Sequence, residues 1–186
     1  MTAPGPVAPR RAGFLAAALI ACVSFLGACS AGGTAPPTFP PVGASPAPAG
    51  DATAAVRAEV AGALSVEGLQ ILDATVAVRP PEGALFASAP RTVIQVVLPD
   101  DPTHGYIVLY AFASPAAALA AAKDEAAYIA SGPGNVQFTP GTQFTLRVSG
   151  TSAVFFSWVP DNAPDTRTPS IPIALSQVGV GVEIPS

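Results

Sequence analysis

Hydrophobic and polar positions in the second half of the chain follow the two-residue period of β-strands. Residues 142–148 (TQFTLRV) alternate strictly between polar and apolar side chains, and residues 152–159 (SAVFFSWV) follow after a Ser-Gly turn. This arrangement predicts a hairpin with one face in the core. Residues 92–98 (TVIQVVL) and 106–112 (YIVLYAF) are almost entirely apolar or β-branched. They are typical of central strands buried on both faces, and the short loop between them predicts a second hairpin.

The most clearly marked helix is predicted over residues 115–131. Ser114 is the expected N-cap, Pro115 fits the first helical position, and Gly132 is a natural stop. Its spacing predicts an apolar stripe that packs on a sheet, formed by Leu119, Ala122, Ala126 and Ile129. Lys123, Asp124 and Glu125 are expected to face water.

Two weaker helices complete the prediction. Asp51 is the expected N-cap of a helix over 52–64, and Thr168-Pro169 is expected to cap a short helix that extends to Val178, with Gly179 as its stop. Shorter strands are expected at 69–78 and 180–184. These elements predict a single α+β domain with a mainly antiparallel sheet and helices packed on one face. From Tyr106 onward the order β, α, β, β, α, β resembles a ferredoxin-like plait, preceded by a helix and extra strands.

The first 28 residues have the three parts of a secretory signal. Arg10-Arg11 precede an apolar run at 13–28, which is shorter than the roughly 20 residues that a spanning helix needs. The run ends in Leu26-Gly27-Ala28-Cys29, which resembles the lipobox of bacterial lipoproteins. The resemblance implies lipidation of Cys29 by a diacylglyceryl group, cleavage before that residue, and further acylation such as palmitate. Two or more acyl chains give stable membrane anchoring.

Composition divides the rest of the chain into a linker and a folded part. Residues 29–50 combine the lipidated Cys with a stretch that is rich in Pro, Gly and Ala and has no charged side chain. Such a stretch is typical of an extended, flexible linker. Residues 51–186 are long enough for one hydrophobic core. We therefore expect a signal peptide (1–28), a linker (29–50) and a globular domain (51–186) on the extracytoplasmic side of a bacterial membrane, either the cell membrane or the outer membrane.

Charge and residue types exclude several classes of function. Loss of residues 1–28 leaves six basic and twelve acidic residues, a net charge of −6, so nucleic acid is not an expected partner. Once Cys22 is removed with the signal and Cys29 is lipidated, the folded part keeps one His and no free thiol. We therefore expect no metal site and no cofactor. Nucleophile elbows, phosphate loops and dinucleotide motifs do not occur in the sequence.

The remaining polar candidates lie in two loops and on two strands. One loop carries Asp100, Asp101 and His104, and the other carries Asp161 and Asp165. Trp158 shares a strand face with Phe156, and Arg147 alternates away from the predicted core on the neighbouring strand. We take seven residues as candidate ligand-binding residues, with no catalytic residue assigned: Asp100, Asp101, His104, Arg147, Trp158, Asp161 and Asp165.

These patterns favour a non-enzymatic, lipid-anchored domain that binds an envelope protein or a small molecule. Two alternatives stay open. One is an envelope hydrolase that uses the loop carboxylates at positions 100, 101, 161 and 165, and the other is a structural component of the envelope. Solvated turn residues, or calcium ligands if three or more carboxylates converge, are further interpretations of the same aspartates.

Overall fold

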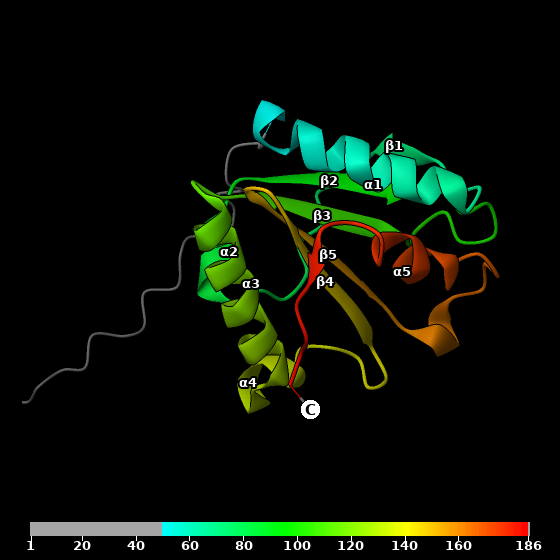
Figure 1. Cartoon of the computed structure of the whole chain (residues 1–186). Coiled ribbons are helices and arrows are strands. Elements are labelled where there is room, and N and C mark those ends of the chain that lie inside the picture. The colour runs from blue at the N-terminus through cyan, green and yellow to red at the C-terminus, as the bar shows by residue number, and fades with distance from the viewer. Residues whose placement is uncertain (1–49, 186) are drawn as a thin grey trace, which may run out of the picture. The chain divides into compact units, whose positions relative to one another are not determined.

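The computed structural model describes residues 50–185, and the predicted signal, lipobox and all but the last residue of the linker lie outside them. Six strands form one antiparallel sheet in the order β1-β2-β3-β5-β4-β6 (Figure 1). The strands are β1 (Ile71–Asp73), β2 (Arg91–Val96), β3 (Tyr106–Ala111), β4 (Gln143–Ser149), β5 (Ser152–Trp158) and β6 (Val180–Gly181). Both predicted hairpins form, and their inner strands β3 and β5 pair at the centre of the sheet.

Five α-helices and two 3-10 turns connect the strands. They are η1 (Gly50–Thr53), α1 (Ala54–Val66), α2 (Ala84–Ser88), α3 (Pro115–Ala130), α4 (Gly132–Asn135), η2 (Pro160–Asn162) and α5 (Ser170–Leu175). Within residues 50–185, every helix is too short or too polar to cross a membrane. The helix α2 was not anticipated from the sequence, where the preceding Pro-Pro pair indicated only a chain break.

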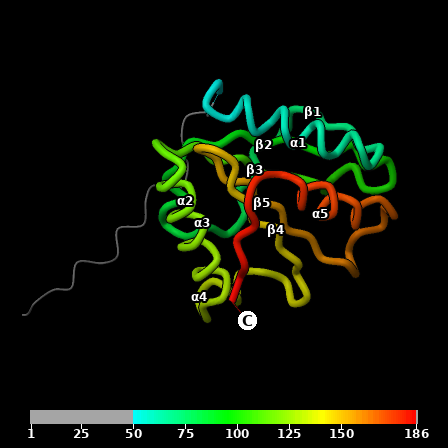
Figure 2. Tube along the Cα trace, viewed as in Figure 1, coloured from blue at the N-terminus to red at the C-terminus, as the bar shows by residue number. Residues whose placement is uncertain are grey.

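Each face of the sheet has its own hydrophobic core, because neighbouring residues on a strand point to opposite sides. On β3, Ile107 and Leu109 pack with α1 and α5, whereas Val108 and Tyr110 pack with α2 and α3. Figure 2 shows the α1 and α5 segments lying together on one side of the sheet, with α3 on the other. The α+β class and the antiparallel sheet are therefore confirmed, and helices cover both faces of the sheet rather than one.

The strand order also differs from a ferredoxin-like plait. In that plait the last strand of the βαββαβ unit pairs with the first, but here β6 pairs with β4 and β2 occupies the place beside β3. The physical reason is the preceding β2–β3 hairpin, which already satisfies that edge of β3. The two outermost strands, β1 and β6, are only three and two residues long, which limits edge-to-edge pairing between molecules.

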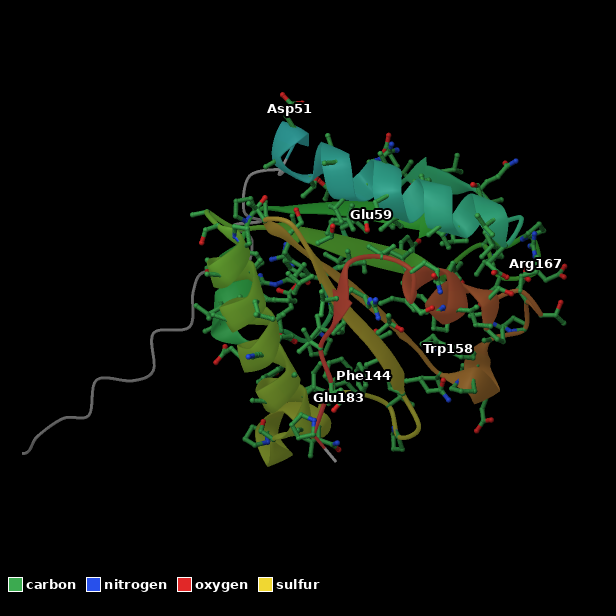
Figure 3. All side chains as sticks on the ribbon, in the orientation of Figure 1. Asp51, Glu59, Phe144, Trp158, Arg167 and Glu183 are labelled. Carbon is green, nitrogen blue, oxygen red and sulfur yellow. The ribbon has the colours of Figure 1, made fainter. Side chains whose placement is uncertain are left out.

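Helix caps match the sequence at one helix and differ at two. Ser114 caps α3 as predicted, because its Oγ accepts a hydrogen bond from the Ala117 N–H at 3.2 Å. Asp51 is not the cap of α1; it is exposed in η1, and its side chain points away from the helix (Figure 3). Thr168 likewise makes no cap bond to α5, since its hydroxyl has no partner.

The prediction that Glu125 faces water is wrong. Only 1% of its surface is exposed, whereas Leu119 on the predicted apolar stripe is 37% exposed. Three residues of the predicted stripe, Ala122, Ala126 and Ile129, are buried as expected, but the buried face is rotated away from Leu119 towards Ala118, Ala121 and Glu125. This rotation places Glu125 against the backbone of Gly83.

Candidate functional site

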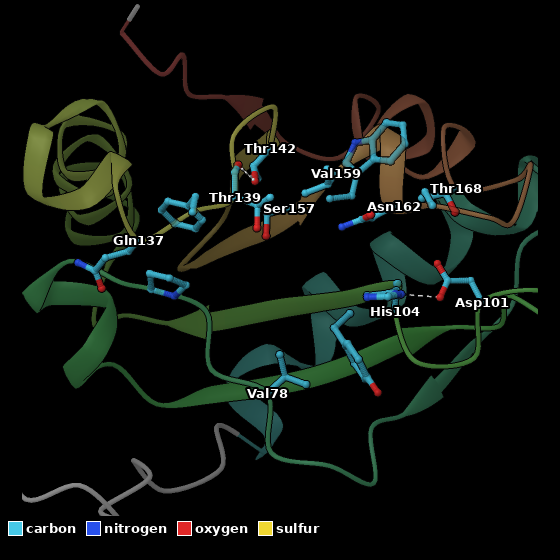
Figure 4. A pocket seen from close by; sticks show the side chains of 16 residues that line it. Val78, Asp101, His104, Gln137, Thr139, Thr142, Ser157, Val159, Asn162 and Thr168 are labelled. Carbon is cyan, nitrogen blue, oxygen red and sulfur yellow. Dashed lines mark hydrogen bonds and ion pairs between the residues drawn. The ribbon is translucent and has the colours of Figure 1, made fainter.

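A cavity of about 360 Å³ lies at the end of the sheet where β3 begins and β5 ends (Figure 4). Its walls come mainly from the loops that follow β1, β2, α4 and β5. The lining residues with the chemistry used below are Asp101, His104, Tyr106, Phe138, Thr139, Thr142, Ser157, Trp158, Asn162 and Thr168. The volume lies at the lower end of the range for small-molecule sites in proteins.

Asp101 and His104 form a hydrogen-bonded pair on one wall. The Nδ1 atom of His104 lies 2.5 Å from Oδ1 of Asp101. An ionised carboxylate can only accept, so the proton of this bond belongs to the imidazole. The carboxylate is almost fully buried whereas 62% of the imidazole is exposed, and the far side of the ring faces the cavity (Figure 4). Asp101 thus holds the imidazole in one orientation.

The loop that carries this pair is held by backbone and side-chain contacts. The Gln95 side-chain amide donates to the carbonyl oxygens of Pro102 and His104, at 2.7 and 3.2 Å. Gly105 follows with a φ of +78°, a conformation that favours glycine and returns the chain to β3. These contacts fix Asp101 and His104 relative to the sheet.

Two buried polar atoms in the cavity wall have no hydrogen-bond partner. They are Oδ2 of Asp101 and Oγ1 of Thr168, in residues that are 3% and 2% exposed. Figure 4 shows both side chains at the same end of the cavity as His104. Because an unsatisfied buried acceptor costs about 1–3 kcal/mol, atoms of this kind are expected to meet a bound group or an ordered water.

Asp165 joins two walls of the cavity. Its carboxylate accepts from Nε and Nη2 of Arg167 at 2.9 and 2.6 Å, and from the backbone N–H of Asp100 at 3.2 Å. The bidentate hydrogen bonds from Arg167 hold the pKa of Asp165 far below its usual value. The bond from Asp100 connects the loop after β2 with the loop after β5, and the bonds from Arg167 hold the carboxylate in place.

Aromatic side chains supply much of the apolar wall. Trp158 is half-buried and packs against the core beneath α1 and α5. Phe138 stacks edge-on against Phe144 with ring centroids 4.8 Å apart, which fixes its position beside the cavity. Tyr106 is also half-buried and stands at the start of β3. The cavity thus combines a polar end with an aromatic flank.

The seven residues predicted from the sequence do not all meet. Asp101, His104 and Trp158 line the cavity, whereas Asp100 and Asp165 connect its walls. Asp161 is exposed in η2 and is not part of the lining. Within residues 50–185, no group of three or more His, Cys, Asp or Glu side chains is placed to hold a metal ion.

Arg147 lies away from the cavity, at the end of α5. Its Nε donates to the carbonyl of Val178 at 2.7 Å, and its Nη2 donates to the carbonyls of Ser176 and Gly179 at 2.7 and 2.9 Å. Unpaired carbonyls at a helix C-terminus attract positive charge. The guanidinium therefore anchors the turn that follows α5.

A second polar cluster is buried between the sheet and α3. Glu82 accepts hydrogen bonds from Arg91 and from the Tyr110 hydroxyl, the latter at 2.5 Å. Glu125 accepts the N–H of Gly83 at 2.8 Å, and burial raises the pKa of Glu125 to about 7. The cluster fixes the segment before α2, whose neighbours Val78 and Pro81 line the cavity.

Sequence patterns did not indicate three of these residues. Thr168 was interpreted as a cap, and its role depends on a hydroxyl that the fold leaves unpaired beside Asp101. Glu82 and Glu125 lie 43 positions apart in the chain and meet only because α2 and α3 pack together. No local spacing signals such a contact.

Comparisons with protein-family models, with curated proteins and with solved structures found no match to this chain. The functional argument therefore rests on the chemistry of the site.

Proposed function

We propose that this chain is a lipid-anchored extracytoplasmic binding protein that holds a small molecule in the cavity, without chemical turnover. Its membrane partner is the bilayer itself, through acyl chains on Cys29. The linker that follows, residues 30–50, reaches roughly 65 Å when extended as polyproline II. Such a tether lets the domain sample the space next to the membrane for its ligand.

The observation that carries this proposal is the pair of unpartnered atoms, Asp101 Oδ2 and Thr168 Oγ1, in the wall of a cavity of ligand size. A purely structural domain gains nothing by burying acceptors that it does not satisfy. A binding site does, because the ligand supplies the missing partners. Hydrogen bonds hold the segments that carry these two side chains: Gln95 donates to the carbonyls of Pro102 and His104, and the Thr168 N–H donates to the Asp165 carbonyl.

The test is a thermal-shift screen of the full-length protein in a non-ionic detergent. The panel comprises calcium, sugars, amino acids, amines, peptidoglycan fragments and lipids. A ligand at about 100 times its dissociation constant adds about 2.7 kcal/mol to the free energy of unfolding, which raises the Tm by several degrees. The shift is expected to be smaller in Thr168→Val, which removes one hydroxyl and nearly conserves volume. A panel without any shift, or shifts that are equal in wild type and variant, would refute the proposal.

A second candidate function, a hydrolase, is favoured by one observation, the Asp101–His104 pair. An imidazole oriented by a carboxylate is the general base of many hydrolases, and the hydroxyls of Thr139, Thr142 and Ser157 line the same cavity. Fluorogenic ester, amide and glycoside substrates test this function. The hydrolase function predicts turnover of at least one substrate. His104→Ala should abolish this turnover without changing the Tm, and Asp161→Asn should leave it intact. The binding function predicts no turnover of the ester, amide or glycoside substrates.

A further inference from the structure

The cavity presents negative charge and no fixed positive charge. Asp101 contributes a buried carboxylate, and none of the described residues that line the cavity is a lysine or an arginine. Arg167, which directly precedes Thr168 in the sequence, donates two side-chain hydrogen bonds to the Asp165 carboxylate. An anionic ligand would therefore meet repulsion from the Asp101 carboxylate, whereas a cation would be attracted to it; the titratable basic group in the lining, His104, contacts the Oδ1 atom of that carboxylate and leaves Oδ2 without a partner.

The hydrogen-bonding capacity of the site points in the same direction. Oδ1 of Asp101 is already occupied by His104, which leaves Oδ2 in need of a donor. The Thr168 hydroxyl can accept a hydrogen bond as well as donate one, so a group with more than one donor can serve both Oδ2 and Oγ1. An ammonium has three donors and no acceptor, whereas a hydroxyl has one donor. A charge-assisted bond to a buried carboxylate is also about twice as strong as a neutral one.

The rest of the wall suits an apolar body attached to that ammonium. Trp158, Tyr106 and Phe138 provide aromatic surface along the cavity. Aromatic faces also attract cations, which adds to the preference for positive charge over negative charge. The cavity is large enough for one small organic molecule.

We propose that the ligand is a small organic amine whose ammonium group binds Asp101 and Thr168 and whose apolar part packs against Trp158 and Tyr106. This inference rests on the binding function proposed above and names the class of its ligand.

The experiment compares three probes of similar shape: phenethylamine, 2-phenylethanol and 3-phenylpropanoate. Ligand-observed NMR titrations use the full-length protein in a non-ionic detergent. We expect phenethylamine to bind at least about tenfold more tightly than the alcohol, because the alcohol has one uncharged donor in place of three charged ones, and we expect the carboxylate to bind most weakly. In Asp101→Asn the preference for the amine over the alcohol is expected to vanish.

Two further variants separate local from general effects. Asp161→Asn removes an equal charge from an exposed position outside the lining, so it is the matched control and is expected to keep the preference. Thr168→Val is expected to weaken the binding of phenethylamine by about fivefold and to have little effect on the binding of 3-phenylpropanoate. If Asp101→Asn does not fold, the comparison of probes on the wild type and on Thr168→Val still decides the matter.

The outcomes distinguish the ligand class from the binding function. If the alcohol or the carboxylate binds as tightly as the amine, the amine proposal is overturned while binding in the cavity stands. A preference for the amine that Asp161→Asn also removes reflects net charge alone and overturns the proposal as well. If no probe binds and the thermal-shift panel is also silent, the proposed binding function fails together with it.

Discussion

Burial controls the acid–base behaviour of Glu125. Its carboxyl lies between α3 and the segment before α2, where it accepts a single N–H from Gly83. Desolvation is the largest cause of its raised pKa, and the nearby charge of Glu82 adds to it, while the Gly83 hydrogen bond opposes both. The folded protein therefore binds a proton at this residue under conditions in which the unfolded chain does not.

We predict that Glu125 makes the protein less stable as the pH rises. The folded pKa of about 7 lies above the ordinary value of 4.5, so the stabilisation is complete below pH 4.5 and is lost as the pH rises through 7. The loss is on the order of 2–3 kcal/mol in the free energy of unfolding. Glu125→Gln keeps an acceptor for Gly83 and removes the titration. Urea unfolding should show that the stability of Glu125→Gln relative to the wild type is greater at pH 8 than at pH 5.

Asp161→Asn is the control for that measurement, because it removes an exposed carboxyl in η2 that is not among the charges acting on Glu125. Its difference from the wild type should be the same at both pH values. Asp165 does not interfere, because its lowered pKa means that its contribution is lost only in acid, below its ordinary value of 3.8. If the difference in free energy of unfolding between the wild type and Glu125→Gln stays constant from pH 5 to 8, the raised pKa does not belong to Glu125.

Arg147 lies away from the cavity, and its side chain holds the turn after α5 through hydrogen bonds to backbone carbonyls. Arg147→Ala removes three charge-assisted hydrogen bonds to the carbonyls after α5, so we predict a loss of about 2 kcal/mol. Arg57→Ala is the comparison, because its ion pair with Asp73 is exposed and should be worth under about 1 kcal/mol. Urea unfolding midpoints, compared at equal m-values, measure the stability lost in each variant. If Arg147→Ala and Arg57→Ala lose the same free energy of unfolding, Arg147 does not anchor the turn after α5. Probe binding in the cavity should survive in either variant.

Among the elements, the turn after α5 depends on a glycine. Gly179 has a φ of +46°, and a Cβ there would lie 2.1 Å from the carbonyl oxygen of Val148. Its N–H donates to Glu59 on α1, so the turn also ties two helices together. The short helix α5 packs against α1 rather than standing alone. The stability of this element therefore comes from its neighbours.

We predict that Gly179→Ala costs more than about 3 kcal/mol or prevents folding, because backbone strain and a clash with backbone act together. Gly141→Ala is the control for strain alone: its φ is +83°, but a Cβ there meets open space. It should cost about 1–2 kcal/mol. Thermal unfolding followed by circular dichroism compares the two, and similar Tm values would show that the contact with Val148 is not limiting.

The whole molecule combines a membrane anchor predicted from the sequence with a domain whose cavity lies at one end of its sheet. Cys29→Ala is expected to lose the acyl chains and the cleavage before position 29, because both depend on the lipobox cysteine. Cys22→Ala, which lies within the predicted signal, should leave lipidation intact. Fractionation of bacterial cells with mass analysis of the N-terminus measures both. Cys29→Ala protein that is still lipidated, or wild-type protein whose N-terminus carries no acyl chain, would contradict the lipobox interpretation.

Local patterns in the sequence determined much of the architecture. The alternation on β4, the β-branched runs on β2 and β3, and the Ser114-Pro115 start of α3 all appear in the structure close to where they were expected. These features depend on neighbouring residues alone, which is why a single chain reveals them. The lipobox has the same local character, and its function stays a prediction.

Only the tertiary structure decided which faces and which distant side chains meet. The register of β3 and β5 and the packing of helices on both faces arise from contacts between remote segments. The sequence indicated Asp101, His104 and Trp158 as polar or aromatic loop and strand residues, but not that Thr168 joins them. Burial of Glu125 depends on the rotation of α3 by its alanine contacts. Such pairings are set by the packing of the whole domain, and no local spacing encodes them.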